Sequence, residues 1–370
     1  MHNPIHLVVL IGIALGSMIS CNQAVDLADE KKKIQAQIDL IEEAHLKKSA
    51  EQFYQPNATS FYDIRNGNVE KVNKADLIAG TQSYLDSMEF YELKKIQEPI
   101  IEISDDGTLA SYIGNVVVKG RFKRAPVFWL VSWQSMLKKI DKEWKIISTA
   151  NTEAPTAANT SIILQNVKKV VGRMDASGSV YAMADCYGPI GDFKTLIFSR
   201  ETDGRMEQRK KSGHVILKYG DSASWGKNIR SQRIYSNLDT LNKLFVKGHE
   251  FHWLSMRPED RFSNPVFKGF TEFNRQTSFK IEFKDALNRS VYFYYSFDDY
   301  MPLGFENPTD TQENMVQVYF SNWKEINGLK LFQNVSIEEG SAIWKYDFTE
   351  FKINELVSSD FENKNKVIVD

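Results

Sequence analysis

Residues 245 to 305 contain sixteen Phe, Tyr and Trp side chains, and this density constrains the fold more than any other feature of the chain. Aromatic and β-branched side chains favour strands. Within the segment, Phe279, Ile281 and Phe283 alternate with charged residues, which is the pattern of a strand with one buried face. The segment therefore predicts an antiparallel sheet. Its rings either line an apolar cavity or fill a core, and both alternatives stay open.

Composition narrows the class of protein. The chain has 370 residues, 42% of them hydrophobic and 25% charged, which is ordinary globular usage and predicts two or three domains. The net charge of −2 carries no basic excess, so we expect no nucleic-acid partner. Two cysteines are too few for a disulfide scaffold or a four-cysteine zinc site. We expect no cofactor.

The N-terminus predicts export. Residues 5–14 form an apolar run that is too short to span a bilayer and that suits a signal peptide. Residues 15–21 (LGSMISC) resemble the lipobox of bacterial lipoproteins, although the preceding segment has no Lys or Arg. The resemblance implies a signal peptide over 1–20, acylation of Cys21, a tether over 21–30, and anchoring in the cell envelope, which we expect to be at the outer membrane. The alternative is a secretory signal with an incidental cysteine.

A first domain is predicted over 31–150. Ile34, Ile38, Ile41 and His45 fall on one face of a helix that spans 31–53, and Asn73 is a candidate cap of a second helix. Five strands are expected, at 58–63, 96–104, 109–119, 127–138 and 143–149.

Three stretches of this domain carry a family resemblance. Residues 53–58 (FYQPNA), 103–110 (ISDDGTLA) and 138–146 (KKIDKEWKI) resemble the turns and hairpins of the cone fold that SnoaL-like cyclases, ketosteroid isomerases and nuclear transport factor 2 share. The resemblance implies a curved antiparallel sheet around helices, with a conical pocket. That fold hosts enzymes and non-enzymes alike, so function must be argued from the site.

Candidate site residues in this domain fall in two groups. Proton transfer in such a pocket needs a His or a carboxylate, for which His45 and Asp63 are weak candidates. Aromatic side chains are candidates for lining a pocket around an apolar ligand: Tyr54, Tyr62, Trp129 and Trp133. Ordinary packing is the alternative for every residue in both groups.

A linker is predicted over 151–160, followed by a second domain over 161–370. A helix at 161–171 and a helical insertion at 238–247 accompany many short strands. Residues 320–331 (FSNWKEINGLKL) and 343–354 (IWKYDFTEFKIN) resemble the closing strands of LolA/LolB-like outer-membrane lipoprotein carriers. The resemblance implies an antiparallel half-barrel around an apolar cavity that takes acyl chains. No residue maps onto a functional position of a carrier.

Two further features are predicted to be structural. His249 and His252 are three residues apart, whereas the helical zinc motif needs a spacing of four, and Gly248 is expected to end the preceding helix. We therefore predict no metal site. Cys186 would be the only thiol left beside an acylated Cys21, and we expect it to be a buried, inert side chain.

The sequence thus predicts an α+β protein, with an N-terminal cone fold followed by a large antiparallel β half-barrel with packed helices. The leading functional hypothesis is an envelope lipoprotein that binds an apolar or amphipathic small molecule or lipid without catalysis. One alternative is a SnoaL-like isomerase, cyclase or hydrolase. Another is an envelope scaffold or sensor, with a homodimer through the cone-fold domain.

Overall fold

The computed structural model describes residues 26–65, 67–153, 156–174, 178–221, 223–309 and 315–362. The chain divides into two compact units, Met1–Ala154 and Pro155–Asp370, which are described separately. Cys21 and the expected signal peptide lie outside the described residues. Among the helices that the structure describes, none has both the length and the apolar character needed to cross a membrane.

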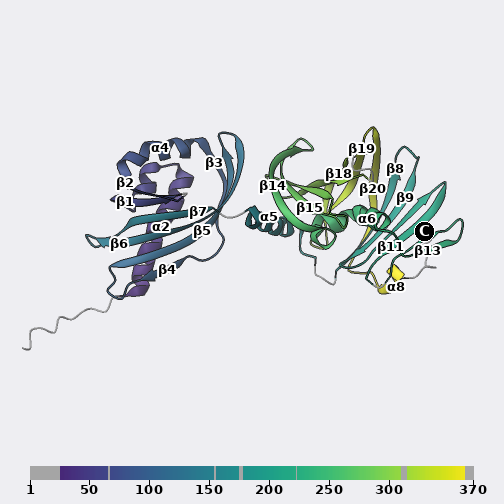
Figure 1. The fold of residues 1–370 in the computed structure, drawn as a ribbon, viewed down its shortest axis with the longest axis horizontal. Helices are drawn as coiled ribbons and strands as arrows, with labels where there is room; N and C mark the ends of the chain where they lie inside the picture. The colour runs from purple at the N-terminus through teal and green to yellow at the C-terminus, as the bar shows by residue number, and fades with distance from the viewer. Residues whose placement is uncertain are drawn as a thin grey trace, which may run out of the picture. The chain divides into compact units, whose positions relative to one another are not determined.

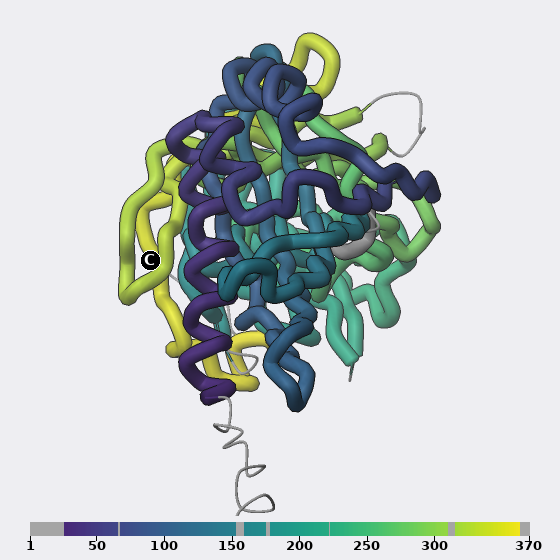
Figure 2. The backbone as a smooth tube through the Cα atoms, turned by 90° about the vertical axis from the view of Figure 1, so that its left-hand side faces the viewer, coloured from purple at the N-terminus to yellow at the C-terminus, as the bar shows by residue number. Residues whose placement is uncertain are grey.

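The first unit contains a seven-stranded sheet with the order β2-β1-β7-β6-β5-β3, in which β4 also pairs with β5. All pairs are antiparallel except β1 with β7, which is parallel. Figure 1 shows α2 crossing one face of this sheet, and Figure 2 follows the same helix along its length into α3. The elements are α2 (Leu27–Lys47), α3 (Ala50–Tyr54), β1 (Asn57–Arg65), β2 (Asn68–Asn73), α4 (Lys74–Ser87), β3 (Met88–Lys95), β4 (Ile100–Ile103), β5 (Leu109–Phe122), β6 (Ala125–Ile140) and β7 (Glu143–Glu153).

The helix expected over 31–53 is two helices. Lys48 adopts a left-handed conformation with φ of 54°, which ends α2, and its backbone N–H is satisfied by the last carbonyls of that helix. Ser49 then caps α3, because its hydroxyl accepts a 3.3 Å hydrogen bond from the backbone N–H of Gln52. The apolar face of α2 was predicted correctly, since Ile34 and Ile38 are fully buried in the core of this unit.

The strand expected over 96–104 was wrong in its extent. Only Ile100–Ile103 forms a strand, and the preceding β3 (Met88–Lys95) was not among the five expected strands. That helix begins at Lys74 as expected after Asn73, but the Asn73 side chain hydrogen-bonds Asp76 instead of capping a backbone N–H. β3 pairs with β5 over much of its length, so tertiary pairing decides this segment rather than local pattern.

The second unit contains one thirteen-stranded antiparallel sheet with the order β13-β12-β11-β10-β9-β8-β20-β19-β18-β17-β16-β15-β14. β14 and β13 lie at opposite ends of that order, so the sheet is open. Its elements are α5 (Thr156–Val171), β8 (Ser179–Tyr187), β9 (Phe193–Arg200), β10 (Gly204–Lys210), β11 (Gly213–Tyr219), β12 (Trp225–Asn228), β13 (Arg233–Ser236), α6 (Thr240–His249), α7 (Phe251–Met256), η1 (Pro258–Asp260), β14 (Ser263–Phe273), β15 (Gln276–Lys284), β16 (Ser290–Ser296), β17 (Pro302–Pro308), β18 (Met315–Ile326), β19 (Leu329–Glu339), β20 (Ala342–Ile353) and α8 (Ser358–Glu362).

Helix α6 lies across the inner face of this curved sheet (Figure 1). It packs on β10 and β11. A Cβ added at Gly248 would lie 3.0 Å from Nδ2 of Asn307 on β17, and six strands separate β17 from β11 in the sheet order. Gly248 was expected beyond the end of the helix, but α6 continues through it to His249. A small residue is therefore needed in the last turn because the helix approaches β17 closely there.

Six phenylalanines form an aromatic ladder, with one ring on each of the strands β15 to β20. Consecutive rings have centroids 4.3 to 6.0 Å apart, and all six are buried. The ladder consists of Phe283, Phe293, Phe305, Phe320, Phe332 and Phe348. His252 from α7 stacks on Phe332 with a centroid distance of 4.0 Å. Over these six strands the described rings thus pack as a core, and the α+β class expected from the sequence is confirmed.

Candidate functional site

His45 is occupied by structural contacts. Its Nδ1 donates a 2.8 Å hydrogen bond to the carbonyl of Ile41, and the edge-on rings of Phe53 and Phe90 lie 5.0 and 5.7 Å away. Burial lowers the pKa of the imidazole, so His45 is neutral at pH 7. In the described part of the chain, no carboxylate hydrogen-bonds to it.

Asp63 lies on β1, where its carboxylate accepts a 3.0 Å hydrogen bond from Nε of Arg65. Within the described residues its ion-pair partner is the exposed Arg65, and Asp63 and His45 share no hydrogen bond there. The structure does not join the two candidate residues into an acid–base pair.

The four predicted ligand-lining aromatics lie in different surroundings. Trp129 and Trp133 face the same side of β6 and pack against the buried apolar side chains there, with Trp133 stacked on Tyr112 at 5.9 Å. Tyr54 is buried and shares a 2.9 Å hydrogen bond with Thr81. Tyr62 is 49% exposed. Their role in binding a ligand stays a prediction.

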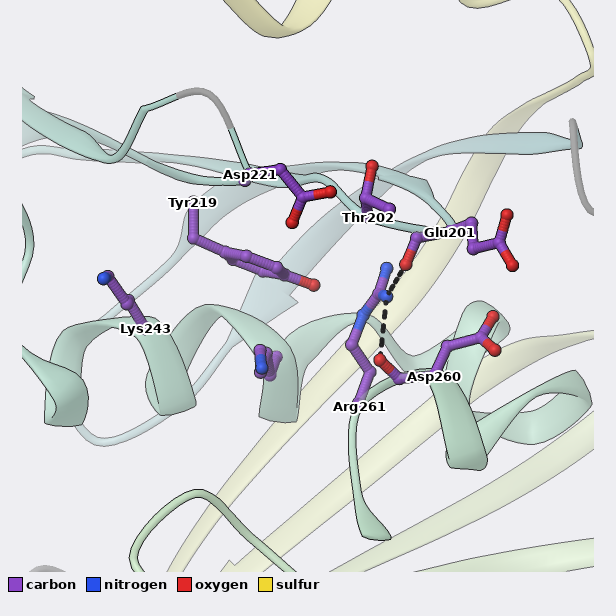
Figure 3. Close-up of a pocket in the computed structure, with 9 residues that line it drawn as sticks. Glu201, Thr202, Tyr219, Asp221, Lys243, Asp260 and Arg261 are labelled. Atoms are coloured by element: carbon purple, nitrogen blue, oxygen red, sulfur yellow. Dashed lines mark hydrogen bonds between the residues drawn. The ribbon is translucent and has the colours of Figure 1, made fainter.

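A polar pocket of about 320 Å³ lies in the second unit. It is at the end of the strands that carries the β9–β10 and β11–β12 turns. Sequence reasoning did not find it. We call it the lysine pocket, and its lining includes Thr202, Tyr219, Asp221, Lys243, Lys247 and Arg261. Figure 3 shows the hydroxyl end of Tyr219 directed toward Arg261, with Lys243 on helix α6.

The floor of the lysine pocket is a buried ion pair. Arg261 donates through Nε and a terminal nitrogen to both oxygens of Glu250, at 2.7 and 2.9 Å, and the Tyr219 hydroxyl donates to the same carboxylate. Burial disfavours the charged guanidinium, but the adjacent Glu250 carboxylate outweighs it and raises the pKa of Arg261. Arg261 also donates to the carbonyls of Arg200 and Glu201, which fixes the β9–β10 turn. The floor is fully paired and therefore rigid.

Two lysines of α6 face this floor without a carboxylate partner. Lys243 and Lys247 are one helical turn apart and both line the pocket, and within the described residues neither has an ion pair. Lys247 lies with its ammonium 5.2 Å from the centroid of the Tyr219 ring. Burial and then the nearby Arg261 lower the pKa of Lys247, so an incoming negative charge would relieve an unfavourable environment.

The acidic groups of the lining are mostly neutralised by other partners. Asp260 pairs with Arg257 at 2.7 Å, and Glu201 pairs with the same guanidinium at 3.4 Å. Arg261 is matched by Glu250. Glu201 and Asp260 thus share one guanidinium, and the two lysines lie against the exposed Asp221, so the charges of this cluster sum to zero. The two lysine ammonium groups, which have no carboxylate partner within the described residues, can still hold an anion.

The remaining predicted features are structural in this unit. His252 donates from Nε2 to the carbonyl of Phe332 at 2.9 Å, and His249 donates from Nδ1 to Phe245 at 2.8 Å. The part of the chain that the structure describes contains no group of three His, Cys, Asp or Glu able to hold a metal. Cys186 is buried, and burial raises the pKa of its thiol to about 12, so it is unreactive at neutral pH.

Comparison with known proteins found no matching family model and no matching curated protein. Solved structures of both predicted kinds are similar to parts of the chain. A putative outer-membrane lipoprotein-sorting protein domain from Vibrio parahaemolyticus is 11% identical, with 56% of this chain and 97% of that chain covered and a TM-score of 0.39. A LolA superfamily protein from Nitrosomonas europaea is 10% identical, with coverage of 56% and 98% and a TM-score of 0.39.

The smaller part of the chain resembles a different group. An NTF2-like protein from Cytophaga hutchinsonii is 18% identical, with 34% of this chain and 98% of that chain covered and a TM-score of 0.29. The resemblances of the sequence to the cone-fold family and to the LolA/LolB-like carriers are thereby confirmed as resemblances. The argument for function rests on the geometry of the lysine pocket.

Proposed function

We propose that the protein is a non-catalytic binding protein of the bacterial cell envelope, lipid-anchored through Cys21, which recognises the anionic group of an amphipathic small molecule or lipid. The observation that carries the binding proposal is the pair Lys243 and Lys247, which face one pocket with no carboxylate partner in the described chain. The lipobox resemblance at 15–21 supports the anchor.

The aromatic ladder supports binding of the polar part of the ligand, and not of an acyl chain, by the second unit. An acyl chain in the middle of the half-barrel would have to displace rings that already pack against each other and against α7. The lysine pocket instead opens at the end of the strands and presents the ammonium groups of Lys243 and Lys247. The proposal therefore places the polar head of the ligand in the pocket and leaves its apolar part outside the core.

Catalysis by the first unit has less support. A general base needs a free lone pair within reach of the substrate. The Nδ1–H of His45 donates to Ile41, which leaves the Nε2 lone pair free, but the rings of Phe53 and Phe90 pack against the imidazole and restrict access to it. We therefore favour binding over an isomerase-like reaction.

Isothermal titration of the purified full-length protein tests this function. Three probes separate the sources of the anion: inorganic phosphate, dodecyl phosphate below its micellar concentration, and zwitterionic dodecylphosphocholine. We expect dodecyl phosphate to bind best, and the variant Lys243→Ala/Lys247→Ala to weaken it about tenfold or more. Lys169→Gln, an exposed lysine on α5, is the matched control. Equal affinity in the double variant, or no binding of either phosphate probe, would contradict the proposal.

A further inference from the structure

A second and larger pocket, of about 530 Å³, opens at the same end of the strands of the thirteen-stranded sheet. It is lined by the β14–β15 turn, the β16–β17 turn and the β18–β19 hairpin. These turns lie at the same end of the strands as the β9–β10 and β11–β12 turns. We call it the hairpin groove. Six of its lining residues carry the argument: Gln276, Phe320, Trp323, Lys324, Glu325 and Lys330.

The groove exists because β18 extends beyond the end of its pairing with β17. Pairing between β17 and β18 reaches Gly304 and Tyr319, whereas β18 continues to pair with β19 as far as Ile326 and Leu329. At Gly304 the two strands are so close that an added Cβ would lie 1.8 Å from the Val318 carbonyl oxygen. Beyond that contact the β18–β19 hairpin projects alone, and the groove lies beside it.

Asn322 turns an indole into this groove. It adopts a left-handed conformation, with φ of 57°, in the middle of β18. Phe320 and Trp323 are three residues apart and would face opposite sides of a regular strand. Instead their rings are 6.4 Å apart, and both contact Phe332, at 4.3 and 5.2 Å.

Most polar side chains around the indole have no side-chain partner in the described chain, and their charges sum to zero. Gln276, Lys324, Glu325 and Lys330 have no side-chain hydrogen bond or ion pair within the described chain. With Asp299, whose carboxylate accepts a hydrogen bond from the backbone of Met301, the lining holds two lysines and two carboxylates. Such a site offers donors and acceptors together without favouring a net charge.

We propose that the hairpin groove binds a saccharide, with one sugar ring packed on Trp323 and its hydroxyls bonded to the amide, ammonium and carboxylate groups around it. A sugar ring presents apolar C–H faces to an indole and both donors and acceptors at its rim. An acyl chain would leave these charged groups desolvated and unpaired. An extended peptide adding to β18 would need a regular strand edge, which the left-handed Asn322 interrupts.

Saturation-transfer NMR and titration calorimetry on the full-length protein test this site with tri-N-acetylchitotriose, maltotriose and a Val-Thr hexapeptide. We expect at least one saccharide to bind, Trp323→Ala to weaken that binding about tenfold, and Trp323→Phe to weaken it less. Tyr187→Ala removes an exposed aromatic ring elsewhere on the same sheet and should leave binding unchanged. Lys243→Ala/Lys247→Ala should also leave it unchanged, which separates this site from the lysine pocket.

Exposed positions keep the test independent of folding. Lys324 and Glu325 are exposed, so Lys324→Ala and Glu325→Ala should keep the thermal midpoint and still weaken saccharide binding. The proposal is overturned if neither saccharide binds at millimolar concentration. It is also overturned if the peptide alone binds, or if binding is the same in all groove variants.

Discussion

The indole Nε1 of Trp144 donates a 2.6 Å hydrogen bond to Oε2 of Glu30, a residue 114 positions earlier in the chain. The contact ties β7 to the first turn of α2. Lys139 and Lys33 lie 2.9 and 3.0 Å from the same carboxylate. Burial opposes ionisation of Glu30, but these three donors outweigh it and hold its pKa at about 2.

This carboxylate predicts an acid-sensitive first unit. Because the folded pKa lies below the ordinary value of 4.5, its contribution is present above pH 4.5 and is lost as the pH falls toward 2. We expect Glu30→Gln to lower the free energy of unfolding by on the order of 1–2 kcal/mol at pH 7. The variant should also lose less stability than the wild-type protein as the pH falls. Urea unfolding at pH 7 and pH 3, followed by hydrogen exchange in β7, measures both effects. Glu43→Gln, at an exposed pair on the same helix, should change little. An equal acid sensitivity in Glu30→Gln would contradict this role.

His252 predicts a second, independent pH dependence in the larger unit. Burial holds its pKa at about 3, so the unfolded chain binds a proton near pH 6.5 while the folded chain does not. Stability from this group is complete above pH 6.5 and falls as the pH drops toward 3, and His249, with a pKa of about 4, acts in the same direction. We expect His252→Phe to reduce the slope of stability against pH between 7 and 4. At pH 7 it should lose about 1–2 kcal/mol, because the Phe332 carbonyl loses its donor. An unchanged slope would show that His252 is not the titrating group.

The ion pair beneath the lysine pocket predicts strong coupling. Removing one member leaves the other charged and buried, so Arg261→Met alone should destabilise the protein by about 3–5 kcal/mol. The double variant Glu250→Met/Arg261→Met should recover much of that loss, since no unpaired charge remains. Thermal unfolding of the two single variants and the double variant gives the coupling energy directly. Additive losses would mean that the two residues stabilise the fold independently.

The aromatic ladder predicts where a truncation is costly. Phe305 is fully buried between Phe293 and Phe320, so Phe305→Ala should cost about 3–5 kcal/mol. Phe245 on α6 is 45% exposed, and Phe245→Ala should change stability far less. Chemical denaturation of both variants compares a ring in the ladder with one at the surface. Similar losses at the two positions would mean that the ladder is not the core.

Local pattern was enough for much of this fold. The alternation of Phe279, Ile281 and Phe283 correctly placed a half-buried strand, and all three side chains are buried. Ile34 and Ile38 marked the buried face of α2. These positions follow from periodicity, which neighbouring residues fix without help from the rest of the chain. β3 could not be found in this way, because it exists through pairing with β5.

The lysine pocket could not be predicted from the sequence pattern for a different reason. Lys243 and Lys247 have the spacing of one helical turn, which the sequence displays, but a charge pair on a helix is usually solvated. What makes them a site is Tyr219 and Arg261, which come from β11 and from the residue after η1. Their convergence depends on the path of a thirteen-stranded sheet. The unpaired state of the lysines depends on which carboxylates are already taken by Arg257 and Arg261.

The most direct test of anion binding is NMR of the full-length protein after reductive ¹³C-methylation of its lysines, with the two pocket resonances assigned from Lys243→Arg and Lys247→Arg. The Lys247 signal should titrate at lower pH than those of exposed lysines, since burial lowers its pKa. Added dodecyl phosphate should raise that midpoint and shift both pocket signals, while Lys169 stays still. If the pocket signals do not move while other lysine signals do, the anion binds elsewhere and the proposed function of the lysine pocket is wrong.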